Sequence, residues 1–183
     1  MKKQSTRPEL PKSETRRGFM KRAGTATAFM IVPRAVLGGE NYIAPSDRLN
    51  IAAVGAAGKG SSDIQSVAHE NIYAICDIDD RRLADTLKQD FAASFRDRTR
   101  SYRDYREMLD SEPEIDAVLI STPDHMHAPI AMHAIGMGKH VYVQKPLCHT
   151  VNECRMLARV AEANNVVTQM GNQGHAGEGA RLI

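Results

Sequence analysis

From residue 48 onward, short apolar runs alternate with longer segments in which apolar and polar residues are interspersed. The short runs are rich in Ile, Val and Ala, a composition typical of strands that are buried on both faces. The run at 115–121 gives the strongest signal and the run at 99–102 the weakest. These runs predict strands at residues 49–54, 71–78, 99–102, 115–121, 140–143 and 166–170.

The segments between these runs have the spacing of helices. Leu83, Leu87 and Phe91 recur at intervals of four, so they share one helix face. Ser61 opens the first helical segment, and Gly138 is a typical stop for another. The predicted helices cover residues 61–69, 79–95, 105–109, 129–137 and 151–163.

Strands that alternate with helices at these lengths predict a parallel sheet, and right-handed crossovers place helices on both of its faces. We therefore predict an α/β fold, a doubly wound parallel sheet, at residues 48–170. No run reaches the roughly 18 apolar residues that suggest a membrane-spanning helix.

The composition is that of a soluble globular protein, with 42% apolar and 25% charged residues in a chain of 183. The net charge of +2 hides an uneven distribution, because residues 1–22 carry eight Lys and Arg against two Glu. The remainder is mildly acidic, so no nucleic-acid partner is expected. Cys76, Cys148 and Cys154 form no Cys-x-x-Cys pair, which predicts core residues and neither a disulfide framework nor a zinc site.

The basic leader contains the string TRRGFMK at residues 15–21, followed by a weakly apolar run at 23–37. It resembles a twin-arginine export signal. This predicts a leader at 1–38, a linker at 39–47, the twin-arginine export machinery as a partner, and a periplasmic or otherwise exported protein. Pro33 and Arg34 interrupt the apolar run, and the alternative is a disordered basic tail that leads into a short helix.

The first predicted strand leads into a glycine-rich turn followed by a helix. Such a turn directs backbone N–H groups from the positive end of a helix, which suits a diphosphate. The dinucleotide-binding fingerprint has glycine at its first, third and sixth positions, and here these are Gly55, Ala57 and Gly60. The methyl group of Ala57 displaces the diphosphate slightly outward, and Gly58 beside it offers room. We predict cofactor contacts at Gly55, Ala57, Gly58, Lys59 and Gly60.

Asp77 strengthens this interpretation, because a glycine-rich turn alone is weak evidence. It lies 22 residues after Gly55, at the end of the second predicted strand, where a carboxylate accepts both ribose hydroxyls of NAD. The alternative is a solvated carboxylate at a strand end. A carboxylate repels the 2′-phosphate of NADP, so NAD is the predicted cofactor. Arg81 and Arg82 are positive charges close by, so NADP is not excluded. Arg82 is counted among the predicted cofactor contacts.

Two further strings are STPDHMH at residues 121–127 and GKHVYVQKP at residues 138–146. With the glycine loop and Asp77 they resemble the Gfo/Idh/MocA family of glucose–fructose oxidoreductase and inositol dehydrogenase, from about residue 49 to 169. The resemblance implies a Rossmann NAD(P)-binding domain and a sugar or polyol substrate, which the lysine matching Lys145 reaches near the nicotinamide. It also implies cofactor contacts at Thr122, Pro123, His127 and Gln144.

Lys145 is the predicted catalytic residue. Hydride transfer from a carbinol needs a base or a proton relay, and a partly buried lysine near a cationic ring can take that role. Pro146 restricts Lys145 to extended backbone. Gln144 departs from the family's usual glutamate, which removes a negative charge beside Lys145 or alters the relay. The alternative is an exposed lysine at a strand end.

The histidines His125, His127, His149 and His175 have no spacing of metal ligands, so no metal is predicted. The resemblance gives His127 a role in shaping its loop. Residues 171–183 are predicted to begin the crossing to a second domain. There His175 and Glu178 bind sugar hydroxyls, or the segment is a flexible linker.

The resemblance also implies a second α/β domain with a large open sheet, which we do not find in this chain. We therefore expect a part of a longer, homo-oligomeric NAD(P)-dependent oxidoreductase that acts on a sugar or polyol. This part alone is expected to bind NAD without turnover. Two alternatives remain, a nucleotide-binding module without catalysis and an NAD-dependent glycosidase of the same fold.

Overall fold

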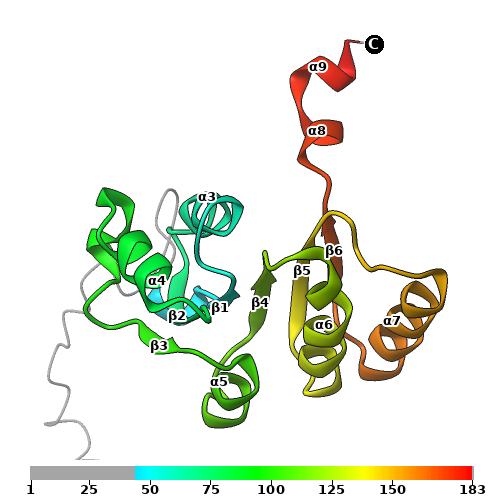
Figure 1. Cartoon of the computed structure of the whole chain (residues 1–183), viewed down its shortest axis with the longest axis horizontal. Helices are drawn as coiled ribbons and strands as arrows, with labels where there is room; N and C mark the ends of the chain where they lie inside the picture. Colours follow the sequence, from blue (N-terminus) through cyan, green and yellow to red (C-terminus); the bar gives the residue numbers. More distant parts are fainter. Residues whose placement is uncertain (1–43, 183) are drawn as a thin grey trace, which may run out of the picture. The chain divides into compact units, whose positions relative to one another are not determined.

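The computed structural model describes residues 44–182 (Figure 1). The predicted twin-arginine leader at 1–38 and the first part of the predicted linker lie outside these residues. The strands are β1 (Asn50–Val54), β2 (Asn71–Cys76), β3 (Arg100–Tyr102), β4 (Ala117–Ile120), β5 (His140–Gln144) and β6 (Thr168–Gly171). The helices are α3 (Lys59–Ser66), α4 (Asp80–Leu87), α5 (Tyr105–Ser111), α6 (His127–Gly136), α7 (Val151–Asn164), α8 (Gln173–Ala176) and α9 (Glu178–Arg181). Short 3₁₀ turns lie at η1 (Pro45–Asp47), η2 (Asp90–Ser94) and η3 (Asp124–Met126).

The six strands form one sheet in the order β3-β2-β1-β4-β5-β6, and every neighbouring pair is parallel. The order reverses between β1 and β4, where the chain turns from one half of the sheet to the other. The predicted doubly wound parallel sheet is therefore confirmed. All six strands end at the same edge, and a crevice outside that edge at the reversal point is where such sheets bind ligands.

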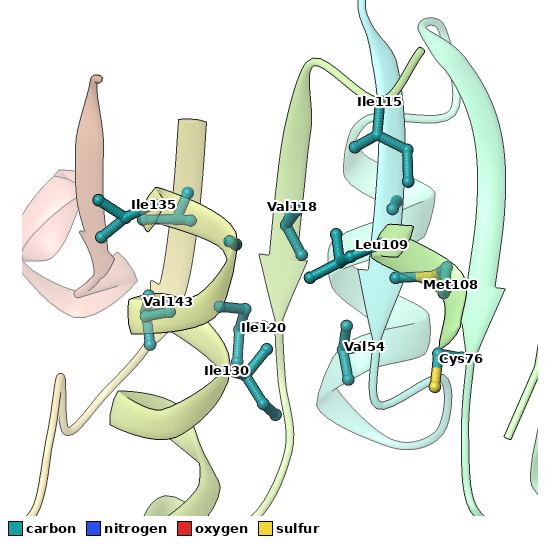
Figure 2. Packing of buried hydrophobic residues seen from close by; sticks show 14 of the residues in the cluster. Val54, Cys76, Met108, Leu109, Ile115, Val118, Ile120, Ile130, Ile135 and Val143 are labelled. Atoms are coloured by element: carbon teal, nitrogen blue, oxygen red, sulfur yellow. The ribbon is translucent and has the colours of Figure 1, made fainter. Parts of the chain in front are cut away.

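Alternation along the strands builds a core on each face of the sheet. In β1, Ile51 and Ala53 pack into a cluster with Ile64 of α3, whereas Ala52 and Val54 pack into the opposite one. Figure 2 shows this second cluster, in which side chains of α5 and α6 lie against the strands. Burying a side chain such as Ile64 contributes about 1.5–3 kcal/mol. The two clusters fix the strand register, and with it the positions of the loops at the carboxyl edge.

Two predicted helices differ from the structure. The helix predicted at 79–95 is broken, because Gln89 has extended backbone (φ −68°, ψ 154°) and η2 follows α4. This break lets Phe95 bury against the sheet. The helix predicted to open at Ser61 begins at Lys59, and its N-cap is Gly58 at φ +58°. The prediction of a serine start was therefore wrong.

Within residues 44–182, none of the helices combines the length and the apolar character that a membrane span requires.

Candidate functional site

The glycine loop between β1 and α3 leaves no space for side chains at two of its positions. Gly55 has φ +89°, and a Cβ there would lie 2.6 Å from the carbonyl oxygen of Ser121. A Cβ at Gly60 would lie 1.8 Å from the carbonyl oxygen of Gly55. Gly58 has no atom within 4 Å of such a position, so only its positive φ favours glycine there. The loop can therefore pass tightly from the sheet edge into α3.

Asp77 joins this loop to the end of β2. Its Oδ2 accepts a hydrogen bond from the backbone N–H of Ala56 at 2.9 Å, and its Oδ1 accepts one from the N–H of Asp79 at 3.0 Å. Each carboxylate oxygen has a further lone pair, so Asp77 can still accept from a ligand hydroxyl. The carboxylate is thus held in place by backbone donors at the spot where the sequence predicts the ribose contact.

A cavity of about 620 Å³ opens beside Asp77 at the carboxyl edge, a volume in the usual range of ligand sites. Six predicted cofactor contacts line it, namely Gly55, Ala57, Asp77, Arg82, Thr122 and Pro123. The hydroxyl oxygen of Thr122 is buried and has no hydrogen-bond partner among the described residues. A buried hydroxyl without a partner is costly, and a ligand polar group in the cavity would relieve it.

The sequence did not predict several residues that also line the cavity, namely Ile78, Asp79, Arg103, Asp104, Tyr105, Arg106, Ser121, His125 and Met126. Four of them, Arg103 to Arg106, follow the short strand β3. The parallel pairing of β3 with β2 brings this loop to Asp77. The position of this loop therefore depends on the order of the strands in the sheet, and a local sequence motif does not reveal that order.

Several charged side chains around the cavity are paired with an opposite charge. Arg106 binds both carboxylate oxygens of Asp104, and this interaction lowers the pKa of Asp104 to about 2. Arg103 lies 3.5 Å from Asp80, and Arg82 lies 3.7 Å from Asp79. Arg82 nevertheless stays largely exposed.

The walls of the cavity include neutral and apolar groups. Burial, followed by the nearby Asp104 carboxylate, raises the pKa of the Cys76 thiol to about 12. This thiol is therefore uncharged at neutral pH. Ile78 is 81% exposed at the rim and offers an apolar surface to an incoming ligand.

The other predicted contacts lie outside the cavity lining. Gly58 is exposed, and Gly60 is buried beneath Gly55. Lys59 forms an ion pair with Asp63 of its own helix. Gln144 is buried at the end of β5 and donates to Asp63 at 2.8 Å.

Lys145 is exposed just beyond β5 and is joined to Pro146 by a cis peptide bond. His175 in α8 and Glu178 in α9 are also exposed, on the short helices that follow β6 in Figure 1. The structure thus brings six of the predicted nucleotide contacts to one cavity, and the predicted substrate residues are not in its lining.

His127 bridges the loops that follow β4 and β5. Its Nε2 lies 2.8 Å from the carbonyl oxygen of Thr122, and its Nδ1 lies 2.6 Å from that of Pro146. The ring is buried, in keeping with the role in loop shape that the resemblance implies. In the described part of the chain, no three His, Cys, Asp or Glu side chains gather as a possible metal site.

These features fit the NAD that the sequence predicts. The glycines allow a diphosphate to approach the backbone and the positive end of α3. The Asp77 carboxylate suits ribose hydroxyls, Thr122 offers a hydroxyl without a partner, and Ile78 offers an apolar surface for a base. The groups around the cavity therefore include donors and acceptors that suit a dinucleotide.

Comparisons with known proteins agree with this geometry. A glycosyl hydrolase family 109 protein of Shewanella baltica (strain OS195) is 33% identical over 172 residues, which covers 80% of this chain and 37% of the relative. The crystal structure of an NAD binding oxidoreductase from Klebsiella pneumoniae has a TM-score of 0.60 at 28% identity, over 74% of this chain and 37% of that one. GenD2 from gentamicin A biosynthesis, in complex with NAD, has a TM-score of 0.61 at 27% identity, over 77% and 37%.

The chain thus spans about 37% of the length of these proteins. A family model described as an oxidoreductase family with an NAD-binding Rossmann fold matches residues 49–172, more than half of the chain. The chain therefore belongs to the Gfo/Idh/MocA oxidoreductase family, and the matched residues are its NAD-binding Rossmann domain.

Proposed function

We propose that this chain provides the cofactor-binding part of an NAD-dependent oxidoreductase that acts on a sugar or polyol. The observation that carries the proposal is the Asp77 carboxylate, which is fixed by two backbone N–H groups between the glycine loop and the cavity. Family membership and the unpartnered Thr122 hydroxyl support it.

The residues of the chain have separate roles in this proposal. The backbone of the glycine loop binds the diphosphate, Asp77 orients a ribose, and Thr122 and Pro123 line the crevice. Bound NAD supplies a hydride acceptor. The neutral amine of Lys145, just beyond β5, receives the hydroxyl proton of the carbinol while the carbinol carbon gives up a hydride, so that the C–O bond becomes a carbonyl.

The preference for NAD over NADP follows from charge. A 2′-phosphate would lie against the Asp77 carboxylate at close range, and like charges in a partly buried site repel strongly. Arg82 offers a partial counterweight, but Asp79 already neutralises it at 3.7 Å.

We expect Asp77→Ala to raise the Kd for NAD about 10- to 100-fold, since a hydrogen bond to a charged group contributes about 1.5–3 kcal/mol. The variant should also reduce the difference between the Kd values for NAD and NADP, because the carboxylate that repels the 2′-phosphate is gone. Titration calorimetry with both cofactors measures the two effects. Asp80→Ala is the matched control, since this neighbouring carboxylate pairs with Arg103 and does not line the cavity. Tighter binding of NADP than of NAD by the unaltered chain would contradict the proposal.

A second candidate, an NAD-dependent glycosidase, is favoured by the 33% identity to the glycosyl hydrolase family 109 protein. In such an enzyme a sugar is oxidised transiently, the glycosidic bond breaks by elimination, water adds to the resulting double bond, and the hydride then returns to the sugar. Both candidates use the same cofactor site, so they differ only in the net reaction.

An activity assay on a panel of sugars, polyols and glycosides separates the two candidates. The dehydrogenase accumulates NADH, seen by its absorbance, in proportion to the substrate that is oxidised. Release of a free sugar from a glycoside with no net NADH would instead establish the glycosidase. The assay uses the enzyme with its substrate domain, which the length of the relatives leads us to propose.

A further inference from the structure

A group of polar side chains lies at the carboxyl edge beside the cavity, and of its members only Ser121 also lines the cavity. We call it the Asp63 cluster, and its members are Lys59, Asp63, Ser121, Tyr142, Gln144 and Gln173. They come from α3, from the ends of β4 and β5, and from α8. The cluster therefore joins the helix of the glycine loop to the strand that leads into Lys145.

Asp63 is the centre of this cluster. Its side chain is only 7% exposed, and a buried carboxylate is stable only with close partners. Oδ2 accepts hydrogen bonds from Ser121 Oγ and from Gln144 Nε2, each at 2.8 Å. Oδ1 accepts from the ammonium group of Lys59.

Gln144 meets Asp63 as a donor. With the Gln173 amide oriented to satisfy its neighbours, the Gln173 oxygen lies 2.6 Å from Gln144 Nε2 and 3.2 Å from Lys59 Nζ. Both N–H groups of the Gln144 amide then have acceptors. A glutamate carboxylate at this position has no N–H and would face Asp63 as a like charge.

The space around the Gln144 amide is closed on the side of β6. Gly171 pairs with Gln144 across the sheet, and a Cβ there would lie 2.9 Å from Gln144 Nε2. A side chain at position 171 would therefore crowd the Gln144 amide. The carboxylate on α3 and the amide at the end of β5 form a matched pair.

We propose that Asp63 is a positioning residue for Lys145. It holds the Gln144 amide, and so fixes the end of β5 from which Lys145 extends. Its other oxygen holds Lys59 beside the glycine loop. The pairing itself depends on the fold alone, whereas its effect on turnover rests on the proposed function.

The test compares Gln144→Glu with the exchanged pair Asp63→Asn/Gln144→Glu in the whole chain. In Gln144→Glu two carboxylates lie within hydrogen-bond distance, so one of them holds a proton and its folded pKa rises above the ordinary glutamate value of about 4.3. Stability is then intact below that ordinary pKa and is lost as the pH rises through the folded pKa. We expect the Tm deficit of Gln144→Glu against the unaltered chain to be larger at pH 8 than at pH 5.

The exchanged pair restores one carboxylate and one amide. It should recover most of the lost Tm at pH 8 and show no added pH dependence. Gln169→Glu is the matched control, because Gln169 is exposed on β6 and its Nε2 donates only to the carbonyl of Met170. Equal Tm deficits of Gln144→Glu at both pH values, or an exchanged pair no more stable than Gln144→Glu, would overturn the proposal.

The kcat of the enzyme with its proposed substrate domain gives a second readout, which a purely structural role would not change in the same way. Gln144→Glu should lower kcat at pH 8 by at least about tenfold, because small displacements of a reacting group are costly, and the exchanged pair should recover it. An unchanged kcat in Gln144→Glu would overturn the positioning role. If the unaltered chain failed to bind NAD, the proposed function would fall, while the comparison of Tm values would still decide the pairing.

Discussion

Replacement of Gly60 by alanine is expected to abolish measurable NAD binding and to lower the free energy of unfolding by about 3 kcal/mol, the upper range for overpacking a tight site. The added methyl group would lie 1.8 Å from the carbonyl oxygen of Gly55 and 2.8 Å from its carbonyl carbon. Both are backbone atoms, so no side chain can rotate away. The loop must shift, and its N–H groups then no longer converge on a diphosphate.

Calorimetric titration with NAD and denaturant unfolding measure these two effects. Gly136→Ala is the matched control, because Gly136 is exposed at the end of α6 and has no atom within 4 Å of an added Cβ. It should keep NAD affinity and gain up to about 1 kcal/mol, as alanine is the better helix former. If Gly60→Ala bound NAD like the unaltered chain, the diphosphate would not lie against this loop.

The second large effect is expected for Lys145→Ala in the enzyme with its proposed substrate domain, where it should lower kcat about 10²- to 10⁴-fold, the usual contribution of a general base. The Kd for NAD should stay within about twofold in the same variant, because Lys145 is exposed and does not line the cavity. A loss confined to kcat separates a role in proton transfer from a role in cofactor binding.

Two further variants sharpen this test. Lys145→Arg keeps the charge but not the ability to release a proton, so it should be as inactive as Lys145→Ala. Lys88→Ala removes an exposed lysine just after α4 that pairs with Asp85 and does not line the cavity, and it should keep full activity. Full turnover by Lys145→Ala would show that another group takes the hydroxyl proton.

The central strands could be predicted from sequence because they are buried on both faces. The run at 49–54 became β1 (Asn50–Val54), and even the weak run at 99–102 became β3. The end of α4 could not be predicted in the same way. Lys88 and Gln89 carry no helix-breaking signal, and the break is set by the burial of Phe95 against the sheet.

The residues of the candidate site also fall into two groups, those placed by local sequence spacing and those placed by the pairing of distant segments. Gly55 and Asp77 belong to one continuous strand–helix–strand unit, so their spacing alone places them together. Arg103 reaches the cavity only because β3 pairs with β2. The contact between Asp63 and Gln144 joins residues 81 positions apart, and no local pattern encodes it.

The His127 side chain connects the loop that follows β4 with the loop that follows β5. One imidazole touches the carbonyl of Thr122, which lines the cavity, and the carbonyl of Pro146, which follows Lys145. Any displacement of the first loop must either carry the second with it or break a buried contact. The loop that lines the cofactor crevice and the loop that carries Lys145 are therefore mechanically linked through the His127 ring.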